Sequence, residues 1–323
     1  MKSFAALLSL IGRHGTLLAA LSIFIGLLLP GLPPLVKPSL GTVIVIMLTL
    51  AFLRVDPVAL KGHFRRPGLI AAAAAWLMLV SPALLGLLFH VVGVAQSLPG
   101  LYFILVLQIS APALMSAPAI AALLGLDVAL TLATLIVSVA LTPLTAGVFT
   151  HIFLGHALAS PLALGVRLFL IIAGSALVAT VIRRFVGSAR LERHRDRIDG
   201  LSVVSFVIFA IAAMDGVTAH IHSDPKLVGG VMLLAMTMSV AQTAVATLLF
   251  LPAGRGLALA IGLAAGNRNL GLMLTATGFA IPDTAWLYFA AAQVPAYILP
   301  HLLRPLARRL TAPPGERSGD RGD

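Results

Sequence analysis

The feature that most constrains this chain is a series of long apolar segments that recurs along almost its whole length. A helix needs about 17–25 apolar residues to cross the hydrocarbon core of a bilayer. Ten such spans are predicted, near 15–31, 39–55, 68–89, 99–125, 128–150, 161–183, 201–220, 227–250, 257–280 and 284–303. Glycine and proline punctuate them, without the alternation typical of barrel strands. We therefore expect an all-α polytopic membrane protein.

The composition supports this class and excludes others. The chain is 59% hydrophobic and 10% charged, so a water-soluble domain could not bury its apolar surface. It has no cysteine, which excludes disulfides, thiolate metal sites and a cysteine nucleophile. The net charge of +11 comes with few aromatic residues. A nucleic-acid partner is therefore not predicted, and the lipid bilayer is the expected surrounding.

The basic residues lie mainly in alternate connections between the spans. If the N-terminus is inside, the inner connections and the tail carry most of them: Arg54, Lys61, Arg65, Arg66, Arg183, Arg184, Arg190, Arg193, Arg195, Arg197, Arg255, Arg304, Arg308 and Arg309. The opposite side has little beyond Lys37, Arg167 and Lys226. The positive-inside rule then predicts that both termini are cytoplasmic.

The chain divides into parts of one membrane-embedded unit. Residues 1–186 are predicted to hold spans one to six, which are the first five-helix repeat and the start of the second. A charged cytoplasmic linker follows at 187–200, spans seven to ten occupy 201–310, and 311–323 form a disordered polar tail. The two halves have similar patterns, because spans four and nine hold matching positions in them and are interrupted at Ala111–Pro118 and Gly262–Asn269. This pattern indicates two inverted repeats with broken helices in matching positions.

Interrupted helices at membrane depth predict a cavity. Unwound backbone there must be surrounded by protein or water, and the half-helix that follows presents free N–H groups and the positive end of its dipole to an anion. In the first break this position falls at Ser116, Ala117 and Pro118. The alternative is that the prolines only kink one helix and the glycines only allow close packing.

Arg268 is the most informative residue, because it lies near the middle of the ninth span. An arginine at that depth costs from about 2.5–3.5 kcal/mol upward, so we expect it to face a cavity, a counter-ion or an anionic ligand. Asn267 and Asn269 flank it and either binds a ligand or caps the second half of the helix. A structural ion pair between Arg268 and Asp215 in the seventh span is the alternative.

Three segments resemble the bile acid:sodium symporter family: Leu124–Leu144 with the preceding break, Gly266–Leu274 (GNRNLGLML) and Met47–Pro57 (MLTLAFLRVDP). The resemblance extends over nearly the whole chain. It implies a bacterial inner-membrane transporter, with broken fourth and ninth helices that cross, substrate near the crossing and two sodium ions behind it.

The chain also departs from that family. The family's sodium-binding glutamate and glutamine of the ninth helix fall at Ala264 and Arg268, and its glutamine of the third helix falls at about Leu77. The serine–asparagine pair of its fourth helix falls at Ala117 and Pro118. Arg268 would then stand in for the bound ions, because one fixed positive charge equals the sum of two sodium ions and one carboxylate.

Two threonines of the fifth span, Thr131 and Thr134, could still offer hydroxyls to an ion, or simply bond to the preceding helical turn. Proton coupling is the other possibility. It would use Asp215, since Asp127 and Asp283 look like helix N-caps at the turns between spans.

The sequence thus predicts a secondary transporter of an organic anion, either a carboxylate, a sulfonate or a bile-acid-like molecule, with weak or no sodium coupling. A sodium- or proton-coupled symporter and a non-transporting membrane sensor remain as alternatives. We expect no enzyme activity, no cofactor and no metal, with sodium left open, and no particular oligomeric state is predicted.

Overall fold

The computed structural model describes residues 15–54, 66–155 and 160–311. Every regular element within these ranges is helical, and the one β-type pairing there is an isolated antiparallel bridge between Ala113 and Arg268. The all-α prediction is therefore confirmed for this part of the chain. Lys61, Arg65 and residues 312–323 of the predicted tail lie outside the described residues.

Six helical segments in the described residues are long and apolar enough to cross a membrane: Leu32–Arg54, Pro67–Val91, Val128–Leu154, Leu162–Val186, Arg195–Ser223 and Pro225–Leu249. Outward faces are apolar as well, since Leu162, Phe169 and Phe185 of α12 (Pro161–Val186) are all more than half exposed. Rows of large apolar side chains on an outer surface are stable in lipid rather than in water. The chain is thus a polytopic membrane protein.

The individual helices have the following bounds. The long segments are built from α3 (Leu32–Val36), the 3-10 turn η1 (Lys37–Ser39) and α4 (Leu40–Arg54); α6 (Pro67–Ala75), the π-helical turn η2 (Trp76–Val80) and α7 (Ser81–Val91); α11 (Val128–Leu154); α12; α14 (Arg195–Ala213) with α15 (Val217–Ser223); and α16 (Pro225–Leu249). The others are α2 (Gly15–Leu28), α8 (Val94–Ser97), α9 (Pro99–Ser110), α10 (Ala117–Leu123), α13 (Ser188–Arg193), η4 (Leu251–Ala253), α17 (Arg255–Gly266), α18 (Leu270–Thr277), α19 (Asp283–Ala291) and α20 (Gln293–Thr311). The predicted spans four and nine are each two short helices, so length alone does not identify them as crossings. The count of ten stays a prediction.

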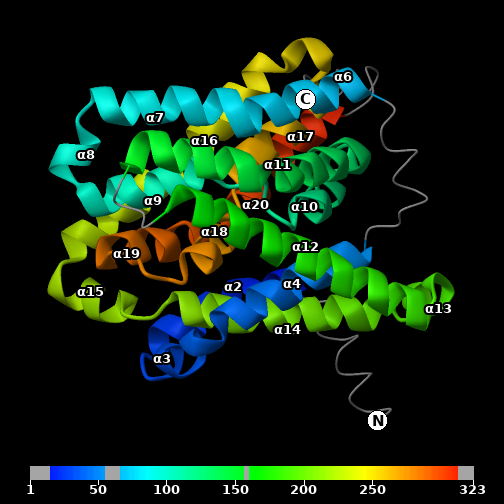
Figure 1. The fold of residues 1–323 in the computed structure, drawn as a ribbon, viewed down its shortest axis with the longest axis horizontal. Coiled ribbons are helices and arrows are strands. Elements are labelled where there is room, and N and C mark those ends of the chain that lie inside the picture. The colour runs from blue at the N-terminus through cyan, green and yellow to red at the C-terminus, as the bar shows by residue number, and fades with distance from the viewer. Residues whose placement is uncertain (1–14, 55–65, 156–159, 312–323) are drawn as a thin grey trace, which may run out of the picture.

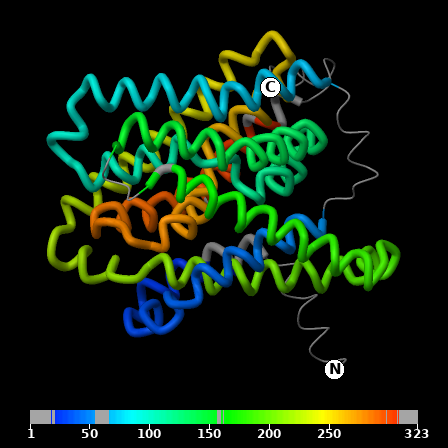
Figure 2. Tube along the Cα trace, in the orientation of Figure 1, coloured from blue at the N-terminus to red at the C-terminus, as the bar shows by residue number. Residues whose placement is uncertain are grey.

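The helices run along the long axis of the molecule in two groups (Figure 1). One group contains α2 and α4, which both pack on α14, although α14 follows α4 only after a long stretch of chain, as the trace shows (Figure 2). The other contains α9, α11, α16 and α17, with α9 against α11 and α16 against α17. Because α12 packs on both α4 and α11, it joins the two groups.

The charged segment at 187–200 is helical rather than irregular. It contains α13 and the first residues of α14, with only His194 between them. Arg54 at the end of α4 pairs with Asp199, with 2.6 Å between Nη2 and Oδ1. Both side chains are more than a third exposed, so this ion pair adds little stability.

Candidate functional site

Two helices are interrupted, and their unwound stretches cross. The first lies between α9 and α10 and the second between α17 and α18. The Leu114 N–H donates to the Asn267 carbonyl (2.9 Å) and the Asn269 N–H to the Pro112 carbonyl (2.8 Å). The backbone groups that leave their helices therefore pair with each other, as burial in a membrane requires. The second break is shorter than predicted, because the residues from Gly262 to Gly266 remain helical against α16.

Arg268 lies in this crossing and is only 7% exposed. Its Nε donates to the Ala265 carbonyl (2.8 Å) and its Nη1 to the carbonyls of Leu77 (2.9 Å) and Ala111 (3.1 Å). Its Nη2 lies 3.4 Å from the Ser81 hydroxyl. Among the described residues, no carboxylate lies within ion-pair distance of the guanidinium. The arginine is thus a buried cation held by carbonyl oxygens.

The local sequence explains why these carbonyls are available. In the π-helical turn, the Ser81 N–H donates to the carbonyl five residues earlier, and Pro82 has no N–H. The Leu77 carbonyl is therefore left for Arg268. Ala111 and Ala265 lie at the C-terminal ends of α9 and α17, where carbonyls lack helical donors and the helix dipoles are negative. Two helix C-termini and one π-turn together stabilise the positive charge.

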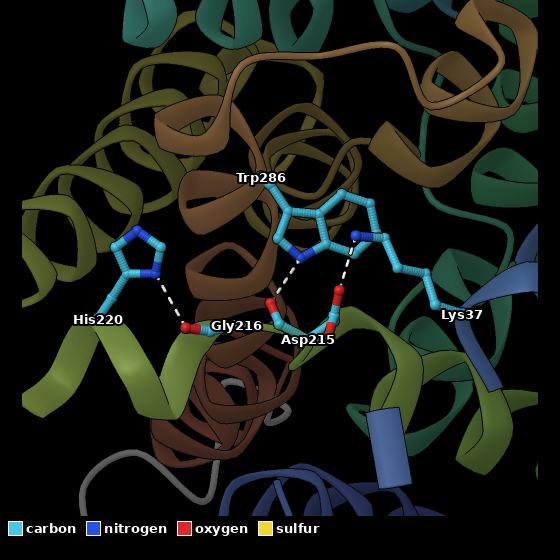
Figure 3. Close-up of polar contacts among 5 residues, drawn as sticks. All are labelled: Lys37, Asp215, Gly216, His220 and Trp286. Atoms are coloured by element: carbon cyan, nitrogen blue, oxygen red, sulfur yellow. Dashed lines mark hydrogen bonds and ion pairs between the residues drawn. The ribbon is translucent and has the colours of Figure 1, made fainter. Parts of the chain in front are cut away.

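Asp215, the alternative partner of Arg268, lies elsewhere. Its Oδ2 is 2.7 Å from the Lys37 Nζ, and that Nζ lies 4.2 Å from the centre of the Trp286 ring. The Trp286 Nε1 donates to the Asp215 carbonyl (3.0 Å), which connects α19 to the end of α14 (Figure 3). His220 contacts only the backbone of its own turn in this view. The proposed Arg268–Asp215 pair is replaced by a Lys37–Asp215 pair.

The two asparagines beside Arg268 have different roles. The Asn269 side chain accepts from the Leu272 N–H (3.2 Å) and so caps the start of α18, as expected. The Asn267 Nδ2 instead donates to the Leu263 carbonyl (2.9 Å) at the end of α17. Its Oδ1 is buried without a hydrogen-bond partner in the described part of the chain. Of the two asparagines, Asn267 is therefore the one whose side-chain oxygen is an unpaired acceptor within these residues.

A cavity of about 100 Å³, the main cavity, lies between the crossing and the group of α4 and α14. Its lining comprises Ile44, Met47, Leu48, Leu114, Met115, Ser116, Phe206, Phe209, Arg268, Asn269, Leu270, Gly271, Leu272, Ala292, Gln293 and Ala296. None of the residues that accept from the guanidinium is in this lining. Arg268 therefore lines the cavity, while its guanidinium donates to the carbonyls of residues outside this lining. Of the three surroundings expected for Arg268, the structure places a cavity beside it, and no counter-ion among the described residues.

The structure places some of the other predicted site residues at the main cavity and others away from it. Ser116 lines the main cavity and is exposed, whereas Ala117 is buried and Pro118 half-buried at the start of α10. The Thr131 hydroxyl donates to the Asp127 carbonyl (2.8 Å), which is the helical-turn bond given as the alternative. Thr134 is buried, and its hydroxyl has no partner among the described residues. Neither threonine lines the main cavity.

Sequence reasoning missed the far wall of the cavity. Met47 comes from α4, and Phe206 and Phe209 come from α14. They are ordinary apolar residues of their helices, so no local signal marks them. Gln293 is different, because a buried carboxamide in an apolar stretch is uncommon; it is 8% exposed and its Nε2 donates to the Phe289 carbonyl (3.0 Å).

Within the described ranges, no group of three or more histidine, aspartate or glutamate side chains could hold a metal ion. In comparisons with known proteins, no protein-family model matches the chain, and no curated protein matches it. The resemblance to the bile acid:sodium symporter family therefore rests on the sequence segments quoted above.

Proposed function

We propose that this protein is a secondary transporter of a small organic anion, in which Arg268 supplies a fixed positive charge. The observation that carries the proposal is the buried guanidinium, which has carbonyl partners but no carboxylate among the described residues. A buried charge is costly unless an opposite charge approaches it. An anion in the adjacent main cavity would neutralise it.

The polarity of the crossing supports an anionic substrate. The C-terminal ends of α9 and α17 meet the guanidinium, whereas the N-terminal end of α18 borders the main cavity through Asn269, Leu270 and Gly271. Helix N-termini attract anions through their partial positive charge. The cation and the anion would therefore occupy opposite sides of one crossing.

The size and lining of the cavity favour a small substrate with an apolar part. Sites for drug-sized ligands usually have ~300–1,000 Å³, so the main cavity of about 100 Å³ is suited to a short-chain carboxylate or sulfonate. A bile-acid-like molecule would need the groups of α4–α14 and α9–α17 to move apart. Met47, Phe206 and Phe209 would cover the apolar part of the anion.

The fixed charge also implies weak or no sodium coupling. Sodium prefers several oxygen ligands, an inference we extend from the chemistry of calcium and magnesium. The carbonyls of Leu77, Ala111 and Ala265 form such a set, but the guanidinium already occupies it. The transporter would thus work by facilitated diffusion or anion exchange. With this function we propose a ten-span inverted-repeat architecture in a bacterial inner membrane with both termini cytoplasmic, as the family resemblance implies.

Counterflow in proteoliposomes tests this function. Vesicles containing the purified protein are loaded with unlabelled propionate, and the uptake of labelled propionate from outside is measured in sodium and in choline buffers. We expect transient accumulation of label in both buffers, because a carrier exchanges substrate and its fixed charge replaces sodium.

The alternatives give different results in the same assay, repeated with lactate, methanesulfonate and taurocholate as probes. A strict sodium requirement would indicate an ordinary symporter. The absence of counterflow with every probe, in a protein that still binds one of them, would indicate a sensor. Empty liposomes provide the background.

A second test addresses proton coupling through Asp215. Its carboxylate pairs with Lys37, and Asp215 does not line the main cavity. We therefore expect Asp215→Asn to leave the response of propionate uptake to an imposed pH gradient unchanged. Lys37→Met, which removes the other partner, serves as the matched control. Loss of the pH response in Asp215→Asn alone would show that Asp215 carries the coupled proton.

A further inference from the structure

A second, smaller cavity lies next to the main cavity and also borders the crossing. It has a volume of about 20 Å³ and is lined by Gln108, Ala235, Ser239, Gly266, Asn267, Arg268, Leu270, Ala292, Pro295 and Ala296. Four of these residues, Arg268, Leu270, Ala292 and Ala296, line the main cavity as well. The small cavity is large enough for one water-sized group. It can therefore receive one polar group of a ligand whose remainder lies in the main cavity.

Asn267 lines this cavity and has a polar atom that is unpaired in the part of the chain that the structure describes. The side chain is 4% exposed, and its Nδ2 is engaged by the Leu263 carbonyl (2.9 Å). The opposite carboxamide orientation would place an oxygen against that carbonyl, so the amide nitrogen lies on the Leu263 side and Oδ1 on the other. Oδ1 has no hydrogen-bond partner among the described residues. Asn267 lines the small cavity, and buried polar atoms in proteins are nearly always paired, so a donor group that enters this cavity would be a partner for the acceptor.

The neighbouring polar groups limit which donor group of a ligand could bind in the small cavity. The Ser239 hydroxyl donates to the Gly266 carbonyl (2.9 Å), so its oxygen offers lone pairs. Gln108 accepts a hydrogen bond from the Tyr288 hydroxyl through Oε1, so its Nε2 remains as a donor group. A hydroxyl both donates and accepts, and it fits this mixed lining. An ammonium group fits poorly, because Arg268 is positive and no carboxylate lines the cavity.

We propose that the small cavity is a subsite for a hydroxyl group of the transported anion, with Asn267 Oδ1 as its acceptor. This inference rests on the proposed function and makes it more specific. The substrate class becomes a short hydroxycarboxylate, or a hydroxysulfonate of the same shape. The anionic group lies near the start of α18, and the hydroxyl lies beside Asn267.

Binding of three matched acids to the purified full chain tests the subsite. Propionate has no hydroxyl, whereas lactate and 3-hydroxypropionate carry one at different positions, and isothermal titration gives each Kd. One hydroxy acid should bind wild type about tenfold more tightly than propionate, the effect of one good hydrogen bond to a buried acceptor. In Asn267→Leu, this preference should disappear while propionate affinity stays close to that of wild type.

The control is Gln242→Leu. Gln242 is equally buried and has an unpartnered Oε1, but it lines neither cavity. It should keep the wild-type preference for a hydroxy acid.

Equal affinity of wild type for all three acids would overturn the subsite while leaving the transporter proposal intact, and the cavity would then hold only water. No binding of these acids, nor of the methanesulfonate and taurocholate probes, would overturn both. The wild-type comparison needs no variant, so poor folding of Asn267→Leu does not remove the test.

Discussion

Replacement of Arg268 by glutamine is expected to lower the affinity for propionate by about thirtyfold in sodium-free buffer. Arg268 lines the main cavity, while its guanidinium donates to carbonyls of residues outside that lining. For an assumed charge-to-anion separation of ~8 Å and an effective dielectric constant of ~20, a unit charge contributes about 2 kcal/mol, which corresponds to about thirtyfold in Kd. Glutamine removes the charge but keeps an amide nitrogen at the position of the arginine Nε, which can still donate to the Ala265 carbonyl and so limits damage to the crossing.

The same variant tests the relation between the arginine and sodium. Without the guanidinium, the carbonyls of Leu77, Ala111 and Ala265 lack a cation. We therefore expect sodium to restore part of the lost affinity in Arg268→Gln and to have no effect on wild type.

The measurement is the thermal stabilisation of purified protein by propionate, with and without sodium. A ligand at a hundredfold its Kd adds about 2.7 kcal/mol of stability, so the loss is easily seen. Arg183→Gln is a suitable control, because Arg183 also donates to backbone carbonyls but lines neither cavity. Sodium-dependent stabilisation of wild type, retained in Arg268→Gln, would contradict the fixed-charge mechanism.

Replacement of Gly266 by alanine is expected to destabilise the protein by about 1–3 kcal/mol, the usual cost of overpacking a dense interior. A Cβ at Gly266 would lie 2.0 Å from the Thr243 Oγ1 and 2.5 Å from the Ser239 carbonyl oxygen of α16. Gly262, one turn earlier, approaches α16 in the same way. This small-xxx-small pattern allows α16 and α17 to pack closely, and a methyl group would push them apart.

The displacement would also reach the site, because α17 ends directly before Asn267 and Arg268. Gly266→Ala should therefore lower both the apparent Tm in detergent and propionate binding. Gly230→Ala in α16 is the matched control, since a Cβ there meets nothing within 4 Å. It should be neutral or slightly stabilising, as alanine favours a helix over glycine by about 1 kcal/mol. Equal melting of the two variants would show that α16 and α17 do not need this close approach.

The class of protein and the region of the candidate site follow from local features of the chain. Long apolar segments fix a helical membrane protein, because a bilayer leaves the backbone few other ways to pair its hydrogen bonds. Proline and glycine runs marked both interruptions, since proline removes an N–H and disfavours the helical conformation before it. The position of Arg268 in an apolar segment marked it as a residue with a function or a partner.

Which side chains and carbonyls meet depends on how the helices pack in the folded protein. Lys37, Asp215 and Trp286 come from three distant parts of the chain, so no local pattern could show that Lys37 takes the carboxylate considered for Arg268. The carbonyl partners of Arg268 were hidden for another reason: every residue has a carbonyl, and helix packing alone determines which of them is free and within reach. The apolar wall of the cavity likewise depends on how α14 lies against the crossing, because sequence periodicity identifies a buried face but not what that face contacts.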